Sequence, residues 1–179
     1  MASNPSSPAG RDPGHGGEQQ DVLVELYAGP RGDLRDLFEL AEDSAVQLDA
    51  YLDEGRVLVA AVPGVRAAGH LQLVDVDGAG TFELKNMAVR EDLQGRGIGR
   101  RLVEAAVELL TGEAAALLLV ATAAADIGNL RFYQRMGFRM RSVERDAFTP
   151  ATGYPDPVMI DGIELRDRVW LDQPLGSTK

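Results

Sequence analysis

The spacing of hydrophobic positions changes several times along the chain, and each change predicts a different element. Apolar and polar residues alternate over 22–27, as they do in a half-buried strand. Helical spacing replaces this alternation over 33–52, where two apolar stripes predict two short helices. Asp33 is the expected N-cap of the first helix, and Val46 belongs to the apolar stripe of the second.

The next segments have the pattern of strands. Two of them, 56–62 and 67–76, are joined by Pro63-Gly64, which signals a tight turn. A third apolar segment, 81–89, follows a glycine-rich turn. Short connections favour antiparallel pairing, so these three segments predict an antiparallel meander.

The segment after residue 102 fits two structures. Its alanine content also suits one long helix over 103–125. Gly112 interrupts that pattern, and the run of Leu and Val within 115–122 is typical of a buried strand. We therefore predict a helix that ends near Gly112 and a strand over 115–122.

The last part of the chain predicts one more helix and two more strands. Asp126 is the expected cap of a helix over 127–136, and a strand is expected over 138–145. Prolines and glycines predict a long loop over 148–164. A final strand over 165–171 is expected to close the sheet.

A glycine-rich turn separates the 81–89 strand from the helix that follows it. Its glycines, at positions 95, 97 and 99, leave room for main-chain N–H groups to approach a ligand closely. The first turn of a helix adds unpaired N–H groups and the positive end of the helix dipole. Arg96 and Arg100 add positive charge. The turn is therefore typical of a phosphate-binding loop.

Two common phosphate motifs do not fit this turn. A P-loop needs Lys and then Ser or Thr after its last glycine, but Arg100 and Arg101 follow Gly99. The dinucleotide motif G-x-G-x-x-G meets Arg100 in one register and Leu102 in the other. Nucleotide hydrolysis and dinucleotide binding are therefore not favoured.

The spacing that does fit is Gln94-x-x-Gly97-x-Gly99, preceded by the apolar strand end Met87-Ala88-Val89. It resembles the pyrophosphate loop of the GNAT superfamily of acetyl-CoA-dependent N-acetyltransferases, here of a bacterial type. A second match lies at 126–138, where a helix carries Tyr133 and stops at Gly137-Phe138. Two motifs in this order are far more specific than a glycine loop alone.

The resemblance is strong over 83–138 and weaker over 22–171. It implies an α+β fold with a mixed, mostly antiparallel central sheet of about six to seven strands, flanked by about four helices. The sheet is expected to be splayed between its fourth and fifth strands. The implied cosubstrate is acetyl-CoA, and the implied binding residues come from the strand, the loop and the later helix: Met87, Ala88, Val89, Gln94, Gly95, Arg96, Gly97, Ile98, Gly99, Arg100, Asn129 and Phe132.

Two catalytic roles follow from the resemblance. The acceptor is a primary amine, which is mostly protonated at neutral pH, so the reaction needs a base. Glu83 matches the position of a catalytic glutamate, although it also fits an ion pair with Lys85 or Arg56. Tyr133 matches the family's general acid, which gives the leaving thiolate a proton, although it also fits core packing.

One position departs from the family pattern. Many members carry an asparagine between the fifth strand and the next helix, where it helps to hold pantetheine. Here residues 122–125 offer only alanines after a threonine, and Asn129 stands at a different spacing. The alternative to an enzyme is a non-catalytic coenzyme A-binding sensor or interaction module, but retention of Glu83 and Tyr133 favours the enzyme.

Composition and charge indicate the domain organisation, the classes of site and partner that are excluded, and the expected location. We expect a disordered tail over 1–20, rich in Gly, Pro, Ser and Gln, and a single acetyltransferase domain over 21–179. Absence of Cys excludes disulfides and Cys metal sites, and two His are too few for a His-based metal centre. A net charge of −10 argues against nucleic-acid and anionic-membrane partners. With no apolar membrane segment or signal peptide, we expect a cytoplasmic protein. The acceptor is a small molecule or a protein, and a homodimer is left open.

Overall fold

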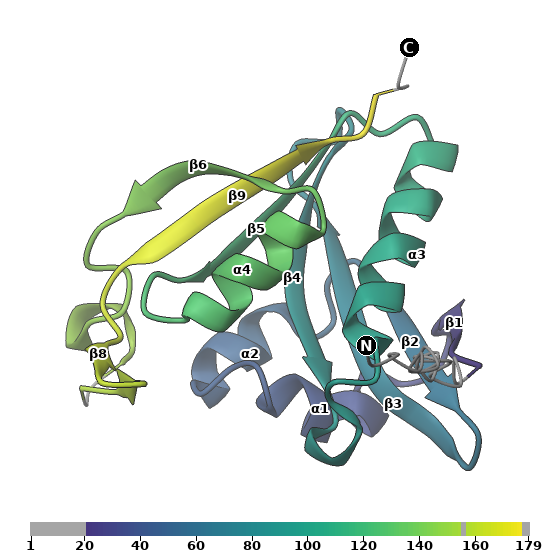
Figure 1. Cartoon of the computed structure of the whole chain (residues 1–179), viewed down its shortest axis with the longest axis horizontal. Coiled ribbons are helices and arrows are strands. Elements are labelled where there is room, and N and C mark those ends of the chain that lie inside the picture. The colour runs from purple at the N-terminus through teal and green to yellow at the C-terminus, as the bar shows by residue number, and fades with distance from the viewer. Residues whose placement is uncertain (1–20, 155–156, 177–179) are drawn as a thin grey trace, which may run out of the picture.

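The computed structural model describes residues 21–154 and 157–176. Seven strands form one sheet in the order β1-β2-β3-β4-β5-β9-β6 (Figure 1). Only β4 and β5 run parallel, and every other neighbouring pair is antiparallel. The strands are β1 (Leu23–Leu26), β2 (Arg56–Val62), β3 (Val65–Asp75), β4 (Thr81–Val89), β5 (Leu117–Ala123), β6 (Arg139–Glu144) and β9 (Arg168–Pro174). The predicted tail lies outside the described residues.

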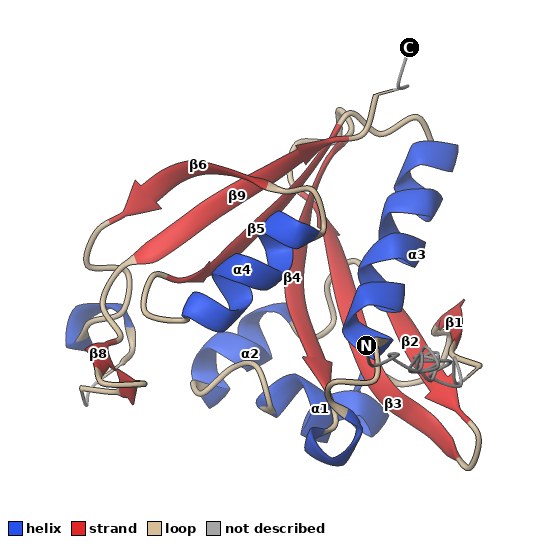
Figure 2. Cartoon of the chain, viewed as in Figure 1, coloured by secondary structure: helices blue, strands red, loops and turns tan. Residues whose placement is uncertain are grey.

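Helices cover both faces of this sheet (Figure 2). One face carries α1 (Arg35–Glu39) and α2 (Ala45–Tyr51), and the other carries α3 (Ile98–Gly112) and α4 (Ile127–Arg135). The smaller elements are the 3-10 helices η1 (Arg31–Leu34), η2 (Glu91–Leu93) and η3 (Pro150–Thr152), and a hairpin of β7 (Met159–Ile160) and β8 (Ile163–Glu164). The predicted fold class is confirmed.

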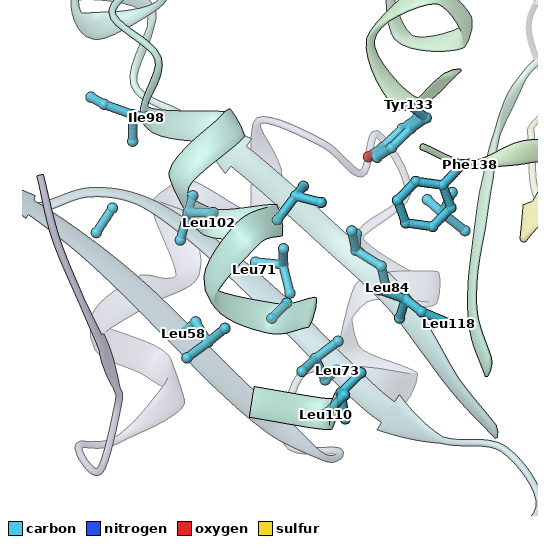
Figure 3. Packing of buried hydrophobic residues seen from close by; sticks show 14 of the residues in the cluster. Leu58, Leu71, Leu73, Leu84, Ile98, Leu102, Leu110, Leu118, Tyr133 and Phe138 are labelled. Atoms are coloured by element: carbon cyan, nitrogen blue, oxygen red, sulfur yellow. The ribbon is translucent and has the colours of Figure 1, made fainter. Parts of the chain in front are cut away.

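The larger core lies between the sheet and α3 (Figure 3). Leu102, Ala106 and Leu110 are fully buried on one face of α3, since residues four apart lie above one another on a helix. Each buried leucine contributes about 1.5–3 kcal/mol. This packing fixes the N-terminus of α3, and therefore the glycine turn before it, against the sheet.

A β-bulge in β4 changes the face of the sheet towards which the side chains after it point. Gln72 lies opposite Asn86 and Leu73 lies opposite Leu84, so Lys85 is an extra residue in β4. Because side chains alternate along a strand, the extra residue shifts the alternation by one. Leu84 and Met87 are three positions apart, a spacing that would place them on opposite faces of a regular strand. Because of the bulge, both pack on the α3 face.

The parallel pair separates where the bulge lies. β4 and β5 are paired over four positions, from Thr81 opposite Leu117 to Leu84 opposite Val120. Beyond Leu84 the two strands diverge, as Figure 1 shows. The expected splay between the fourth and fifth strands is confirmed, and it opens the sheet to a cleft.

Two details expected for the N-terminal helices are wrong. Asp33 lies inside η1, whose N-cap is Pro30, so it does not cap the helix. Val46 is 79% exposed because it lies on the outer side of α2, while Leu48 and Tyr51 pack inwards. The N-cap of α2 is Ser44, whose hydroxyl accepts a hydrogen bond from the Gln47 N–H.

The last strand and the loop before it also differ from the expectation. β9 begins at Arg168 and lies between β5 and β6, so it is an interior strand. Residues before it bond to the loop instead: Leu165 N–H donates to Val158 O, and Phe148 N–H donates to Arg166 O. The 148–164 segment is therefore partly ordered by η3 and the β7–β8 hairpin.

Candidate active site

A cleft of about 980 Å³ runs through the gap between β4 and β5. Its walls come from β4, the glycine turn, β5, α4, the α1–α2 connection and the C-terminal third of the chain. One end reaches the glycine turn on the α3 side, and the other reaches α2. Of the predicted site residues, all but Arg96 line it: Glu83, Met87, Ala88, Val89, Gln94, Gly95, Gly97, Ile98, Gly99, Arg100, Asn129, Phe132 and Tyr133.

The glycine turn presents main-chain N–H groups to the cleft. Gly95 and Gly97 have positive φ angles of 76° and 80°, which a side chain rarely tolerates. Within the described chain, none of the N–H groups of residues 95–100 has a hydrogen-bond acceptor. Six neighbouring donors at the start of a 15-residue helix form a site suited to a phosphate group.

Gln94, one of the implied binding residues, does not add its N–H to this set of free donors. Its N–H donates to Glu91 O at 3.3 Å and closes η2. Its side-chain amide donates to Val89 O at 3.2 Å, so it ties the turn to the end of β4. Gln94 therefore shapes the loop, and the free donors begin at Gly95.

The arginines around the turn are mostly occupied by a carboxylate. Arg100 and Arg101 bind the two oxygens of Glu104 at 2.7 and 2.9 Å. These hydrogen bonds lower the pKa of Glu104. Arg96 is exposed and does not line the cleft. The positive potential of the turn therefore comes chiefly from its N–H groups and the helix dipole.

The free edge of β4 offers further main-chain groups. Arg90 N–H donates to Ala68 O at 2.9 Å, and His70 lies opposite Ala88 in the same ladder. Because bonded pairs alternate along an antiparallel ladder, the N–H and C=O groups of Met87 and the N–H group of Val89 point away from β3, into the gap. The C=O group of Val89 also points away from β3, but it accepts the hydrogen bond from Gln94. An extended ligand can pair with the free groups as an added strand does.

Tyr133 combines a buried ring, which lies beside Phe138 (Figure 3), with a position on the cleft wall. The ring packs edge-on against Phe132 and Phe138, with centroids 5.2 and 5.6 Å apart. No hydrogen-bond partner of its hydroxyl occurs among residues 21–154 and 157–176. Burial, and then the charge of Asp126, raises the pKa of Tyr133, so the hydroxyl keeps its proton.

Capping at both ends of α4 fixes the position of Tyr133. The Asp126 carboxylate accepts from the Asn129 N–H at 2.8 Å, and Gly137 ends the helix with a φ angle of 97°. The Asn129 side-chain amide also donates to Asp126, at 2.8 Å. Asn129 thus lines the cleft with its side-chain NH₂ group already engaged.

Glu83 faces the α2 side of the cleft, opposite the side of Tyr133. Its carboxylate is 3.4 Å from the Lys85 Nζ, and its side chain is 16% exposed. The alternative partner, Arg56, instead binds Glu113 through Nη1 and Nη2 of its guanidinium group. Glu83 is therefore a cleft carboxylate with one long contact to a cation. This position fits both interpretations made from the sequence, a catalytic base and an ion-pair partner of Lys85.

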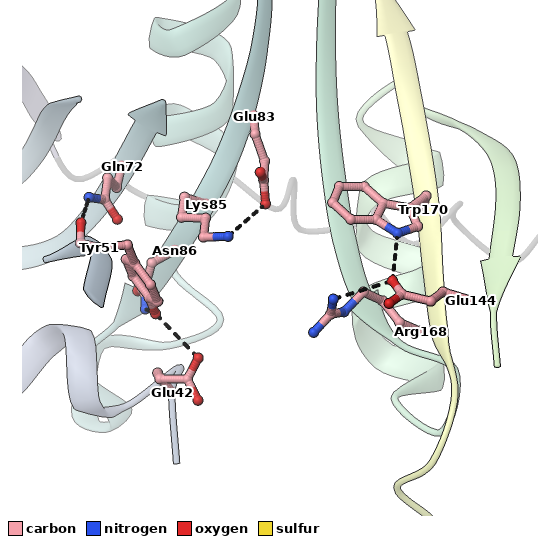
Figure 4. Close-up of polar contacts among 9 residues, drawn as sticks. All are labelled: Glu42, Tyr51, Gln72, Glu83, Lys85, Asn86, Glu144, Arg168 and Trp170. Atoms are coloured by element: carbon pink, nitrogen blue, oxygen red, sulfur yellow. Dashed lines mark hydrogen bonds and ion pairs between the residues drawn. The ribbon is translucent and has the colours of Figure 1, made fainter. Parts of the chain in front are cut away.

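Residues far apart in the sequence form the α2 end of the cleft (Figure 4). Glu42 accepts from the hydroxyls of Tyr51 at 3.4 Å and Tyr154 at 3.2 Å. Burial is the main cause that raises the pKa of both tyrosines to about 12. Since both stay protonated, they act as donors that hold the Glu42 carboxylate in place.

The opposite wall carries another carboxylate, that of Glu144 on β6. It accepts from Trp170 Nε1 at 3.1 Å and from Arg168 at 3.3 Å. The Arg168 guanidinium also lies 5.0 Å from the centre of the Phe148 ring. No sequence pattern predicted that these residues line the cleft. The aromatic residues of the 148–154 loop were the one sequence signal for them.

His70 takes no part in the cleft. It is fully buried, and its Nε2 lies 2.9 Å from Asn86 Oδ1. Burial lowers the pKa of His70 to about 4. Asn86 donates in turn to the Tyr51 hydroxyl at 2.9 Å. His70 is thus a hydrogen-bonded strand histidine that supports the α2 wall.

In residues 21–154 and 157–176, no group of His, Asp and Glu side chains is arranged to hold a metal ion. No helix in this part of the chain has the length and apolar character needed to cross a membrane.

Comparisons with known proteins agree on one family. The model of the acetyltransferase (GNAT) family matches residues 23–138. The uncharacterized N-acetyltransferase YvbK of Bacillus subtilis is 33% identical over 155 residues, which are 86% of this chain and 97% of YvbK.

Solved structures give the same result. A Bacillus subtilis acetyltransferase in complex with CoA superposes with a TM-score of 0.78 at 32% identity, covering 86% of this chain and 99% of that one. An acetyl-CoA-bound GNAT acetyltransferase from Elizabethkingia anophelis gives 0.77 at 28% identity, with coverage of 86% and 98%. With its glycine turn, its splayed β4–β5 pair and these matches, the chain belongs to the acetyltransferase (GNAT) family.

Proposed function

We propose that this N-acetyltransferase moves an acetyl group directly from acetyl-CoA to a primary amine within the β4–β5 cleft, in a complex that holds both substrates. One observation carries the proposal. The free N–H groups of the glycine turn, the Tyr133 hydroxyl and the Glu83 carboxylate all line one cleft, at the point where the sheet separates.

The turn and β4 hold the acetyl donor. The N–H groups of residues 95–100 take the pyrophosphate, because they are unpaired donors at a helix N-terminus. The free main-chain groups of Met87 and the free N–H of Val89 pair with the pantetheine arm. Acetyl-CoA supplies the activated thioester when bound. A free β4 N–H in the gap stabilises the negative charge that develops on the thioester oxygen.

The α2 end of the cleft receives the amine. Its carboxylates outnumber its cations. Lys85 is paired with Glu83, and Arg168 is paired with Glu144. Glu42 and Asp43 have no ion-pair partner in the described chain, so their negative charges remain uncompensated. This surplus of negative charge suits a protonated amine. The acceptor is a small molecule or a protein that presents such a group.

Two side chains move protons. Glu83 accepts a proton from the acceptor ammonium, either directly or through a water molecule, and leaves a neutral amine. Tyr133, which keeps its proton because it is buried, donates to the departing thiolate. The two residues lie on opposite faces of the sheet, so the amine and the thioester meet in the gap between them.

The alternative function is a coenzyme A sensor or interaction module that binds without transfer. A cytoplasmic location and a homodimer also belong to the proposal. All six residues of the edge strand β6 are exposed, which supports a second chain pairing there.

Glu83→Gln tests the role of the base. The variant keeps the shape of the side chain but cannot accept a proton. At acidic pH, where the amine still needs deprotonation, turnover should fall by about 10²-fold or more, and the acidic limb of the pH–rate profile should disappear. Steady-state rates across pH measure this. Glu108→Gln, on the exposed side of α3, is the matched control and should behave as wild type. An unchanged acidic limb in Glu83→Gln removes the base role from Glu83.

A further inference from the structure

The basic residues of this chain are strongly biased towards arginine. Of its 18 Lys and Arg residues, only Lys85 and Lys179 are lysines. Lys85 is also the lysine that lines the cleft. An arginine side chain stays charged under all ordinary conditions, whereas a lysine can lose its proton and become a nucleophile. A primary amine of the chain itself therefore stands in an acetyltransferase cleft.

The position of Lys85 matches that of an acceptor amine. Lys85 is the bulged residue of β4, directly beyond the last β4–β5 pair at Leu84, so it lies where the gap opens. Its Nζ is 3.4 Å from the Glu83 carboxylate, and its side chain is 33% exposed. The ammonium also lies 5.3 Å from the centre of the Tyr51 ring (Figure 4). It occupies a site that binds an alkylammonium group by a carboxylate and an aromatic face.

We propose that Lys85 is a self-acetylation site, modified by the acetyl-CoA bound in the same cleft. The inference rests on the proposed function, because it uses the same cosubstrate and the same two catalytic residues. The Lys85 side chain is flexible and partly exposed, so it can turn from Glu83 towards the gap. Occupation of the α2 end by a true acceptor competes with this movement.

The step balances as an acyl transfer. Glu83 takes one proton from the Lys85 ammonium, and the neutral Nζ attacks the thioester carbonyl carbon. A C–N bond forms, the C–S bond breaks, and the nitrogen loses a second proton to water. The thiolate takes a proton from Tyr133, which regains one from solvent. The products are N-acetyl-lysine at position 85 and free CoA. No oxidant or further reactant is needed.

Acetylation changes the cleft in a defined way. It removes the positive charge that faces Glu83 and the contact of that charge with the Tyr51 ring. The added acetyl group occupies the α2 end, where the acceptor amine binds. Self-acetylation in the absence of acceptor is therefore expected to lower later turnover, and an excess of acceptor is expected to protect Lys85.

The scarcity of lysine makes the test direct. The purified full chain is incubated with acetyl-CoA alone, and peptides are mapped by mass spectrometry over time. We expect acetylation of Lys85 at least tenfold faster than of Lys179, which serves as the internal reference. Lys85→Arg, which keeps the charge, should lose the modification, and Lys179→Arg should retain it. Glu83→Gln should slow it at least tenfold.

Two outcomes overturn the inference. Two results would mean that acetyl-CoA modifies lysine amines chemically, without using the cleft. One is equal acetylation rates at Lys85 and Lys179. The other is a ratio of these two rates that stays the same after the chain is unfolded in denaturant. Calorimetry with acetyl-CoA and an assay of amine-dependent CoA release are run on the same sample. If both are positive while Lys85 stays unmodified, only the self-acetylation inference fails. If neither is positive, the proposed function fails with it.

Discussion

Replacing Tyr133 with phenylalanine should lower turnover by about 10²–10⁴-fold and leave acetyl-CoA affinity nearly unchanged. The variant keeps the ring that packs against Phe132 and Phe138, so the core is preserved. It removes only the hydroxyl. Because that hydroxyl has no hydrogen-bond partner within the described residues, the variant loses no hydrogen bond to them. Steady-state rates and calorimetric titration with acetyl-CoA measure the two effects separately.

The control for Tyr133→Phe is Tyr27→Phe, since Tyr27 lies outside the cleft. This control should keep the wild-type rate. The decisive comparison covers a range of pH, because solvent supplies protons more readily in acid. Wild-type rates in Tyr133→Phe at every pH would contradict the acid assignment and leave thiolate protonation to water.

The second large effect is expected at the glycine turn. Gly97→Val should weaken acetyl-CoA binding by about 100-fold, because losing two N–H hydrogen bonds of about 1–1.5 kcal/mol each corresponds to roughly that factor. Gly97 has a φ angle of 80°, and a Cβ there meets no protein atom within 4 Å. A valine must therefore either hold a strained backbone or turn its N–H away from the ligand, with its side chain in the ligand's space.

A matched control separates strain from ligand contact. Gly64 in the β2–β3 turn has a φ angle of 82° and equally open surroundings, but it lies outside the cleft. Gly64→Val and Gly97→Val should lose similar stability, of about 1–3 kcal/mol. Only Gly97→Val should lose affinity for acetyl-CoA. Equal affinities in calorimetry for wild type and Gly97→Val would remove the turn from the site.

The sequence predicted those parts of the site that are local in the chain. The glycine turn is set by the φ angles of Gly95 and Gly97, and α4 by the Asp126 cap and Gly137, all of which are properties of a few neighbouring residues. Family resemblance then placed Tyr133 on the cleft. The antiparallel meander also followed from local alternation and short turns.

Tertiary contacts determined what the sequence did not predict. Glu42 and Tyr154 are 112 positions apart, and no local pattern indicates that one binds the other. The bulge at Lys85 depends on the register between β3 and β4, which a single strand does not encode. The resemblance implies that Arg100 binds the cofactor, but its guanidinium donates to Glu104, one helical turn later.

Release of CoA from acetyl-CoA across a panel of primary amines tests the central claim most directly. The panel contains polyamines, amino acids, aminoglycoside antibiotics and peptides with free N-termini. We expect CoA release that depends on at least one amine, with an acetyl amide as the product and little release by Tyr133→Phe. Tight acetyl-CoA binding with no amine-dependent release from any member of the panel would contradict it, and would favour the coenzyme A sensor instead.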